Sequence, residues 1–185
     1  MNKLIKLPLF LGIVGCLCGG VLSLTHYFTS DKIAADEEKR ANAAFIAHFE
    51  NLAHRTDVDT LSSELTAAGI TAKAYAYDSS NAYIGTIYTC EAVGYAGKSN
   101  PIKFTVSFSD GAPHHYEEIG HGESAAGSSF MNWLKGDNGG DRLSDLEAGK
   151  ATTGSSITYA AVSKAVSACS VDYLSEYQSI PDYQG

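Results

Sequence analysis

The stretch ITAKAYAYDSSNAYIGTIYTCEAVGYAGKSNPIKFTVSFSDG, residues 70–111, decides the fold class of this chain. It is rich in Ile, Val, Tyr, Thr and Phe. In the segments 70–77, 82–95 and 102–109, the hydrophobicity of the side chains alternates with period two. Such alternation is typical of strands that bury one face. The sequences DSSN, AGKSNP and SDGAP at the segment ends are rich in turn-forming residues. The stretch therefore predicts antiparallel strands joined by hairpins.

Helical patterns flank these strands on both sides. Residues 30–53 combine a capping Ser or Asp with strong helix formers, residues 58–69 predict a second short helix closed by Gly69, and residues 128–134 predict another. Near the C-terminus, apolar residues recur at the spacing of a buried helix face: Ile157, Ala161, Val162, Ala165 and Val166. The order helix, strands, helix predicts an α+β domain with an antiparallel sheet.

Residues 7–28, LPLFLGIVGCLCGGVLSLTHYF, contain no Asp, Glu, Lys or Arg. A helix needs roughly 20 apolar residues to cross a bilayer, so this run predicts a single transmembrane helix. Lys3 and Lys6 precede it, which places residues 1–6 in the cytoplasm and the rest of the chain outside. A cleaved signal peptide, or a lipoprotein box ending at Cys16, is the alternative. The run continues past Cys16 without an A-x-A-like cleavage site, which favours a retained anchor.

The charge of the chain excludes one class of partner. The formal net charge is −8, and without Lys3 and Lys6 the remainder has 11 basic against 21 acidic residues, a net charge of −10. Nucleic-acid binding needs a basic face, so nucleic acid is not expected as a partner. Outside the apolar run the only cysteines are Cys90 and Cys169. They either pair in an oxidising compartment or remain buried thiols, and the sequence leaves both open.

Hydroxyl side chains crowd the start of the last predicted helix, in TTGSSITYAAV from Thr152 to Val162. The first N–H groups of a helix lack partners, and its dipole is positive at that end. Gly154 lets the backbone approach a ligand, and the hydroxyls of Thr153, Ser155, Ser156 and Thr158 are potential donors to phosphate oxygens. Ordinary helix capping explains one or two of these hydroxyls equally well. The residues alone therefore permit a phosphate site without requiring one.

TGSSITYAAV resembles the flavinylation motif of the FMN-binding domain family, S/T-G-A-S/T-x-S/T followed by a residue pair and A-V. Thr153, Gly154, Ser156 and Thr158 match this motif, as do Ala161 and Val162, whereas Ser155 stands in place of its alanine and Lys150 in place of a common aspartate. In that family the second S/T carries FMN through a phosphoester bond. The resemblance implies that Ser156 is the covalent FMN acceptor.

Two further stretches are similar to the same family. EAVGYAGKSNPIKFTVSFSDG, residues 91–111, is similar to its G-Y-x-G hairpin followed by a strand ending in D-G. GHGESAAGSS, residues 120–129, resembles its H-x-E-T-P-G-L-G loop, with His121, Glu123 and Ser124 aligned. The resemblance implies that these three residues border the flavin ring. His121 and Glu123 have no third ligand in view, so no metal site is expected.

The resemblance extends over nearly the whole chain. A membrane helix that runs into TSDKIAADEEKRANAAF is typical of one branch, the G subunit of the Rnf-type ion-translocating ferredoxin:NAD oxidoreductase. The implied organisation is a cytoplasmic N-terminus (1–6), a transmembrane helix (7–28), a helical stalk (29–69), an FMN-binding domain (70–170) and a C-terminal tail (171–185). The chain is then expected to be an electron-transfer subunit of the cell membrane, with its FMN domain outside the cytoplasm, and not an enzyme acting alone.

The same resemblance implies partners. They are the other membrane and iron–sulfur subunits of the complex, together with a separate flavin transferase that attaches FMN. Two alternatives remain open at this point. One is a stand-alone extracytoplasmic FMN protein for extracellular electron transfer, and the other is a flavin-free surface binding module.

Overall fold

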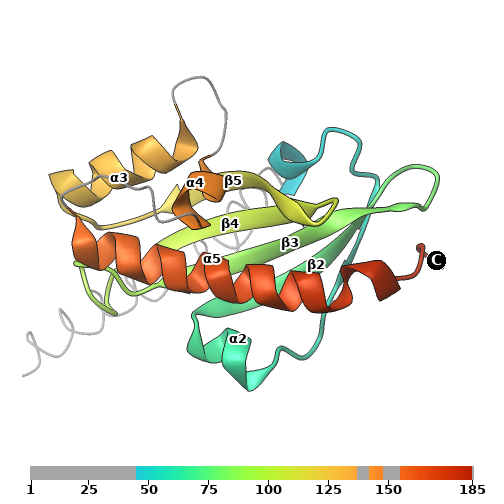
Figure 1. Ribbon diagram of the computed structural model, residues 1–185, viewed down its shortest axis with the longest axis horizontal. Coiled ribbons are helices and arrows are strands. Elements are labelled where there is room, and N and C mark those ends of the chain that lie inside the picture. Colours follow the sequence, from blue (N-terminus) through green and yellow to red (C-terminus); the bar gives the residue numbers. More distant parts are fainter. Residues whose placement is uncertain (1–44, 137–141, 148–154, 185) are drawn as a thin grey trace, which may run out of the picture. The chain divides into compact units, whose positions relative to one another are not determined.

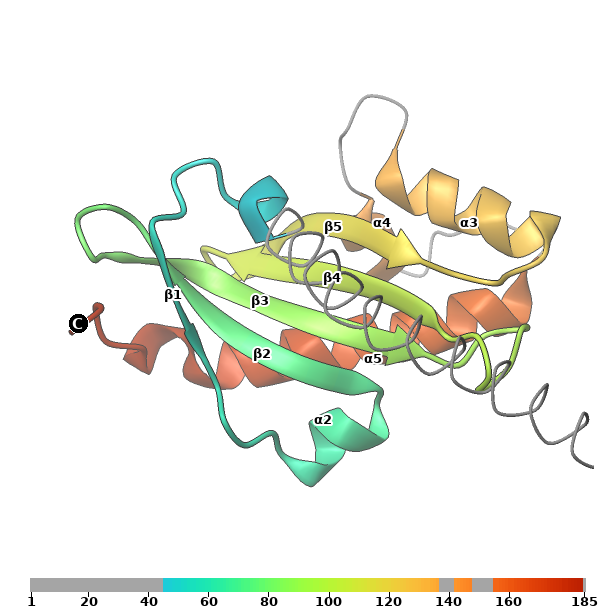
Figure 2. The same ribbon diagram turned by 180° about the vertical axis from the view of Figure 1, so that it is seen from behind.

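The computed structural model describes residues 45–136, 142–147 and 155–184. Its centre is a five-stranded sheet in the order β1-β2-β3-β4-β5, with every neighbouring pair antiparallel. The strands are β1 (His54–Asp57), β2 (Ile70–Tyr77), β3 (Tyr83–Ala92), β4 (Ile102–Ser109) and β5 (Ala112–Gly120). Figure 2 shows them side by side in sequence order, as consecutive hairpins require. The predicted α+β class with an antiparallel sheet is confirmed.

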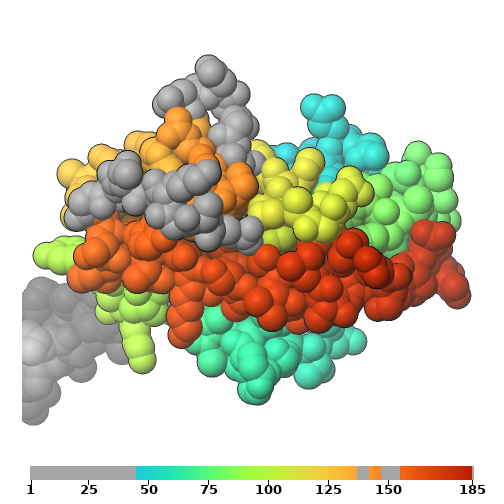
Figure 3. Space-filling view, viewed as in Figure 1, coloured from blue at the N-terminus to red at the C-terminus, as the bar shows by residue number. Residues whose placement is uncertain are grey.

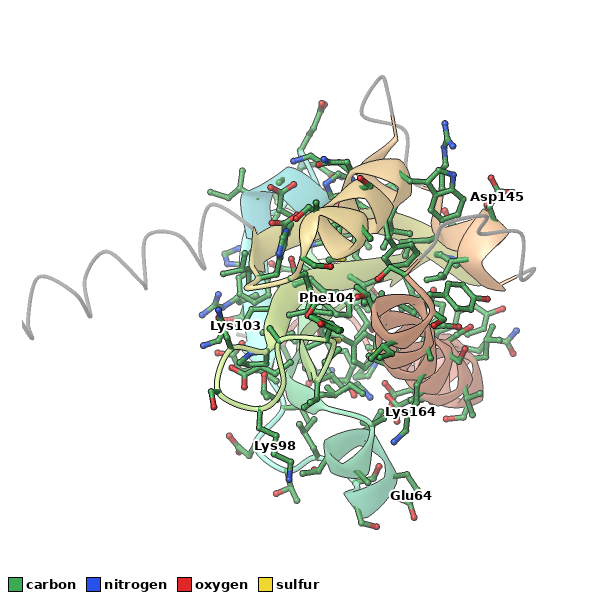
Figure 4. The ribbon with its side chains drawn as sticks, turned by 90° about the vertical axis from the view of Figure 1, so that its left-hand side faces the viewer. Glu64, Lys98, Lys103, Phe104, Asp145 and Lys164 are labelled. Carbon is green, nitrogen blue, oxygen red and sulfur yellow. The ribbon has the colours of Figure 1, made fainter. Side chains whose placement is uncertain are left out.

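The alternation in β4 separates the two faces of the sheet. Ile102, Phe104, Val106 and Phe108 belong to the hydrophobic core, while Lys103 between them is exposed. Figure 4 shows Phe104 in the interior between the sheet and the long helix, with Lys103 at the periphery. The period-two pattern of this segment therefore identifies the residues that face the helices, while Thr105 and Ser107 on the other face of the strand are buried as well.

Helices cover the core face of the sheet. They are α2 (Ser63–Ala67), α3 (Ala125–Lys135), α4 (Leu143–Glu147) and α5 (Ser156–Glu176), followed by the short 3-10 helix η1 (Tyr177–Ser179). α5 lies across this face, with α2 on one side and α3 and α4 on the other (Figures 1 and 3). Its buried residues are Thr158, Val162, Ala165, Val166, Cys169 and Tyr173. Small and β-branched side chains at helical spacing let the helix pack closely on β3 and β4.

A buried lysine ties the C-terminal half of α5 to the sheet. Lys73 of β2 is 5% exposed, and its Nζ lies 2.5 Å from both Asp172 Oδ2 and Glu176 Oε1. Tyr88 of β3 donates a hydrogen bond to the same Asp172 oxygen at 2.8 Å. Burial alone lowers the pKa of Lys73, but the hydrogen bonds to the two carboxylates outweigh it, and the net pKa is raised. Lys73 is therefore a charged residue held by two anions one helical turn apart.

Part of the opposite face of the sheet is covered by residues 45–49, of which 45–48 are helical (Figure 2). The ring of Phe49 packs where a Cβ on Gly85 would stand, 2.4 Å from its Cζ. His48 is 2% exposed, and its ring nitrogens lie 2.9 Å from Ser107 Oγ and 2.7 Å from Thr105 Oγ1. Burial, with further contributions from His115 and His114, lowers the pKa of His48 to about 3. The imidazole is therefore neutral in the folded protein.

Several predicted boundaries differ from the observed elements. β1 lies inside the segment 29–69 that was expected to be a helical stalk, and all four of its residues are exposed, so it lacks an alternating pattern. α5 continues to Glu176, past the expected domain end at 170. The predicted short helix is confirmed as α2, and Gly69 after it has the positive φ of +91° expected of a helix-ending glycine. The transmembrane helix expected at 7–28 lies outside the described residues, among which no helix is long and apolar enough to cross a membrane.

We predict that Lys73→Met destabilises the fold by about 3 kcal/mol, because it leaves Asp172 and Glu176 without their buried cation. Urea unfolding of the wild type and the variant measures this. The matched control is Lys103→Met, which removes a pair with Glu91 at 3.2 Å between side chains that are 53% and 41% exposed. Such an exposed pair contributes below about 1 kcal/mol. Equal losses in the two variants would contradict the role assigned to Lys73.

We predict that the folded protein is destabilised by acid, because His48 is buried in its neutral form. The pKa of His48 is lower in the folded state than in the unfolded state. The stability that this group contributes is therefore fully present above about pH 6.5 and is lost as the pH falls toward 3. Between pH 7 and pH 5 the loss from this group is about 2 kcal/mol. The variant His48→Asn should lose less stability over this interval, as measured by urea unfolding at each pH. The control His54→Asn, on the exposed β1, should keep the wild-type acid sensitivity; a wild-type slope in His48→Asn would refute the assignment.

Candidate functional site

Three segments that are far apart in the sequence meet at the end of the molecule where α5 begins. They are the β3–β4 connection at 93–101, the loop at 121–124 and the first turn of α5. Figure 1 shows this convergence beside the start of α3, and Figure 4 views it end-on, with Lys98 marking the β3–β4 connection. All three segments were singled out in the sequence by motif.

Glu123 joins these segments through its carboxylate. Oε2 accepts a hydrogen bond from the Tyr95 amide at 3.1 Å, and Oε1 accepts one from the Ala96 amide at 3.0 Å. Oε2 also accepts a short hydrogen bond from Thr158 Oγ1 of α5. Burial would raise the pKa of Glu123, but the bonds from Thr158, Ala96 and Tyr95 together lower it. Glu123 is therefore an anion that holds a hairpin and a helix in one position.

Two glycines leave room for this carboxylate. A Cβ on Gly94 would lie 2.5 Å from Glu123 Oε1 and 2.7 Å from Ile102 Cδ1. A Cβ on Gly127 would lie 2.6 Å from Glu123 Cβ and 3.1 Å from Thr158 Oγ1. Side chains at either position would displace Glu123, so the hairpin and the start of α3 can approach α5 only because both residues are glycine.

The hydroxyl groups at the start of α5 divide into inward and outward sets. Ser155 Oγ donates to Thr158 Oγ1 at 2.7 Å, and Thr158 donates in turn to Glu123. Ser155 is 8% exposed and Thr158 is fully buried. Their protons are committed within the protein, so in this arrangement neither hydroxyl donates to a phosphate as the sequence had suggested. Ser156 is exposed and is the first residue of the helix.

A cavity of about 380 Å³ opens beside Ser156. Its lining residues are Tyr95, Ser124, Ala126, Ser155, Ser156 and Ile157. Tyr95 is 68% exposed and Ile157 is 55% exposed, so an aromatic and an aliphatic side chain present free surface next to the Ser156 hydroxyl. The side chain of Ser155, the N-cap residue, accepts no capping hydrogen bond from the backbone N–H groups of the first turn, and that turn contains no acidic residue. The cavity thus combines a nucleophile-type hydroxyl, a positive helix end and an apolar wall.

The remaining predicted site residues have different positions. His121 Nδ1 accepts a hydrogen bond from the Glu123 amide at 3.1 Å, and its Nε2 lies 3.4 Å from Glu118 Oε1, so it orders the loop instead of lining the cavity. Ser124 is the N-cap of α3 and lines the cavity. Thr153 and Gly154 lie outside the described residues. Within the described part of the chain, no three His, Cys, Asp or Glu side chains are grouped as a metal site requires.

A larger cavity lies elsewhere among the described residues. It has a volume of about 840 Å³, and its lining includes His48, Phe49, Tyr83, His114 and Tyr177. Tyr177 follows the C-terminal end of α5, a helix of 21 residues, so this cavity is about 30 Å from Ser156 along the helix. It contains none of the residues predicted for the site.

Sequence reasoning found the three segments but missed the contacts that connect them. Gly127 and Ile157 were not predicted as site residues. Glu123 was expected to contact a ligand, whereas it binds the amides of Tyr95 and Ala96. Nothing in the local sequence around Glu123 indicates these partners, which are 28 and 27 residues away.

No protein-family model, curated protein or solved structure matches this chain. The resemblance to the FMN-binding domain family is therefore carried by the motif residues themselves.

We predict that Glu123→Ala exposes the Tyr95 and Ala96 amides, because both donate to the lost carboxylate. Their hydrogen-exchange rates, read by NMR, should rise about tenfold or more, since hydrogen bonds to charged groups are among the stronger ones. The control Glu117→Ala removes a carboxylate of β5 that lies 3.5 Å from Lys135 Nζ. It should leave both amides protected. Unchanged exchange in Glu123→Ala would show that another group holds the hairpin.

Proposed function

We propose that this chain is an electron-transfer flavoprotein that carries FMN covalently on Ser156. The observation that carries the proposal is the position of the Ser156 hydroxyl: it is exposed at the first turn of α5, beside a cavity, while the neighbouring Ser155 and Thr158 hydroxyls are buried. This arrangement leaves one accessible serine or threonine hydroxyl among the described residues of the motif. The motif match in TGSSITYAAV supports the same residue.

The residues present fit the two parts of FMN. A phosphate esterified to Ser156 Oγ lies at a helix N-terminus, where the dipole and the first N–H groups stabilise an anion. The side chains of Tyr95 and Ile157 are the exposed surfaces beside it on which a flat, largely apolar ring could pack. When bound, FMN supplies reversible uptake and release of electrons. The protein supplies tethering and orientation.

Attachment needs a partner. In this step Ser156 Oγ attacks the flavin-side phosphorus of a flavin adenine dinucleotide, the pyrophosphate bond breaks, and adenosine monophosphate leaves. The Ser156 hydroxyl proton has to pass to a base of another protein, because no described side chain hydrogen-bonds to this hydroxyl as a general base would. We assign the activation of this step to a separate flavin transferase that uses a divalent metal. Covalent attachment suits a domain held outside the cytoplasm, where a lost cofactor cannot be replaced.

The cellular setting is part of the same proposal. The apolar run at 7–28 with Lys3 and Lys6 before it supports a single-pass anchor with the FMN domain on the far side of the cell membrane. Together with the motif resemblance, it supports a role as the G-type subunit of an Rnf-type ion-translocating complex that links ferredoxin and NAD. Its partners there are polytopic membrane subunits and iron–sulfur proteins.

We predict that Ser156→Ala abolishes covalent flavin, because it removes the proposed acceptor oxygen. The full chain would be co-expressed with a flavin transferase, denatured, and separated on a gel. Flavin fluorescence should follow the wild-type band and fall to background in Ser156→Ala. The matched control Ser167→Ala removes an exposed hydroxyl of the same helix and should keep full fluorescence.

Two outcomes would contradict the proposal. Fluorescence that persists in Ser156→Ala would place the flavin on another residue. A colourless wild-type chain would favour a flavin-free binding module.

A further inference from the structure

Two cysteines from distant parts of the chain are in contact inside the core. Cys90 belongs to β3 and Cys169 to α5, 79 residues later, and their sulfur atoms are 3.8 Å apart. Both side chains are fully buried. β3 lies beneath α5 where the helix crosses the sheet (Figure 1). The fold thus brings together the two cysteines that the sequence left unassigned.

We propose that Cys90 and Cys169 form a disulfide that joins α5 to the sheet. A disulfide has a sulfur–sulfur distance of about 2.05 Å, so the observed pair needs to close by less than 2 Å, which side-chain rotation and small helix shifts provide. The pairing is independent of the flavin assignment, because it depends on the packing of β3 against α5. The oxidising compartment in which the bond forms rests on the extracytoplasmic location proposed above.

The bond forms by exchange with an external disulfide. One cysteine thiolate attacks a sulfur of a thiol–disulfide oxidoreductase or of oxidised glutathione and releases one reduced thiol of that reagent. The second cysteine thiolate attacks the resulting mixed disulfide, forms the Cys90–Cys169 bond and releases the second reduced thiol. The protein loses two electrons and two protons, and the reagent's disulfide gains them.

The burial of the two thiols determines at which stage of folding the disulfide can form. Burial, followed by the hydrogen bond with Cys90, raises the pKa of the Cys169 thiol in the folded state. Since the thiolate is the reactive form, the folded dithiol exchanges slowly. The bond therefore forms while α5 is docking, and once formed it is shielded from reductants by the same core.

The crosslink lies between the two polar anchors of α5. Cys169 precedes Asp172, the partner of Lys73, by one turn. Toward the other end, Thr158 is bound to Glu123. A covalent link at this point reduces the freedom of the unfolded chain by closing a long loop. It also keeps the helix seated if either polar anchor weakens.

The test uses the full chain, purified after export to an oxidising compartment or refolded with oxidised and reduced glutathione. Cys16→Ser and Cys18→Ser are introduced together so that only the proposed pair can react. The protein is denatured with an alkylating agent, digested without reductant and analysed by mass spectrometry. We expect most of the Cys90 and Cys169 peptides to be recovered as one crosslinked species. Recovery of both as alkylated monomers, or a link between two chains, overturns the proposal.

A second measurement tests how much the disulfide stabilises the folded protein. Reductant present throughout unfolding should lower the melting temperature of the oxidised protein by roughly 10 °C, because the closed loop is long. The control Cys90→Ala/Cys169→Ala should show no effect of reductant. If the oxidised protein is equally insensitive, no stabilising bond is present. The peptide analysis stands even if the double variant fails to fold.

Discussion

The ion pairs of Lys73 with Asp172 and Glu176 fix where α5 lies along the sheet, and the candidate site depends on that position. The apolar contacts of α5 are made largely by small side chains, such as Ala165 and Val166, and such contacts tolerate a shift by one turn because they are not directional. A buried lysine does not tolerate it, since a shifted helix would leave the charge without a partner at a cost of about 3–5 kcal/mol. The two ion pairs of Lys73 near the C-terminal end of α5 therefore constrain the location of Ser156 at the other end.

Glu123 performs the complementary task at the start of α5. It binds two amides of the β3–β4 connection and the Thr158 hydroxyl, so the hairpin, the loop and the helix cannot move independently. Because Thr158 and Ser155 are engaged in this chain of hydrogen bonds, the accessible hydroxyl on this turn is that of Ser156. Packing therefore leaves Ser156 as the more accessible of the two serines in TGSSITYAAV.

The sequence predicted the parts whose pattern is local. β4 was found because its side chains alternate cleanly, and α5 because its buried residues recur at helical spacing. β1 and β5 were missed because HRTD is exposed throughout and APHHYEEIG buries only Tyr116 fully. The segment ITAKAYAY gives no indication that Lys73 is buried, because the partners of Lys73 come about 100 residues later. In addition, a register shift between Ile70 and Ala72 changes which residues of the strand face the core. The contacts of Glu123 could not be predicted for the same reason, because its partners are also distant in the sequence.

The charges around Ser156 also explain why a covalent bond would be needed to hold an anionic cofactor here. A helix N-terminus stabilises an anion at an exposed position by about 0.3–1 kcal/mol. Glu123 is an anion at the same end of α5, and its repulsion of a second anion there opposes the attraction of the helix dipole. The net charge of −8 adds no attraction. With Ser155 and Thr158 turned inward, few side-chain donors remain to bind a phosphate. Ionic contacts alone would therefore retain FMN weakly, whereas the proposed ester to Ser156 would hold it without relying on such contacts.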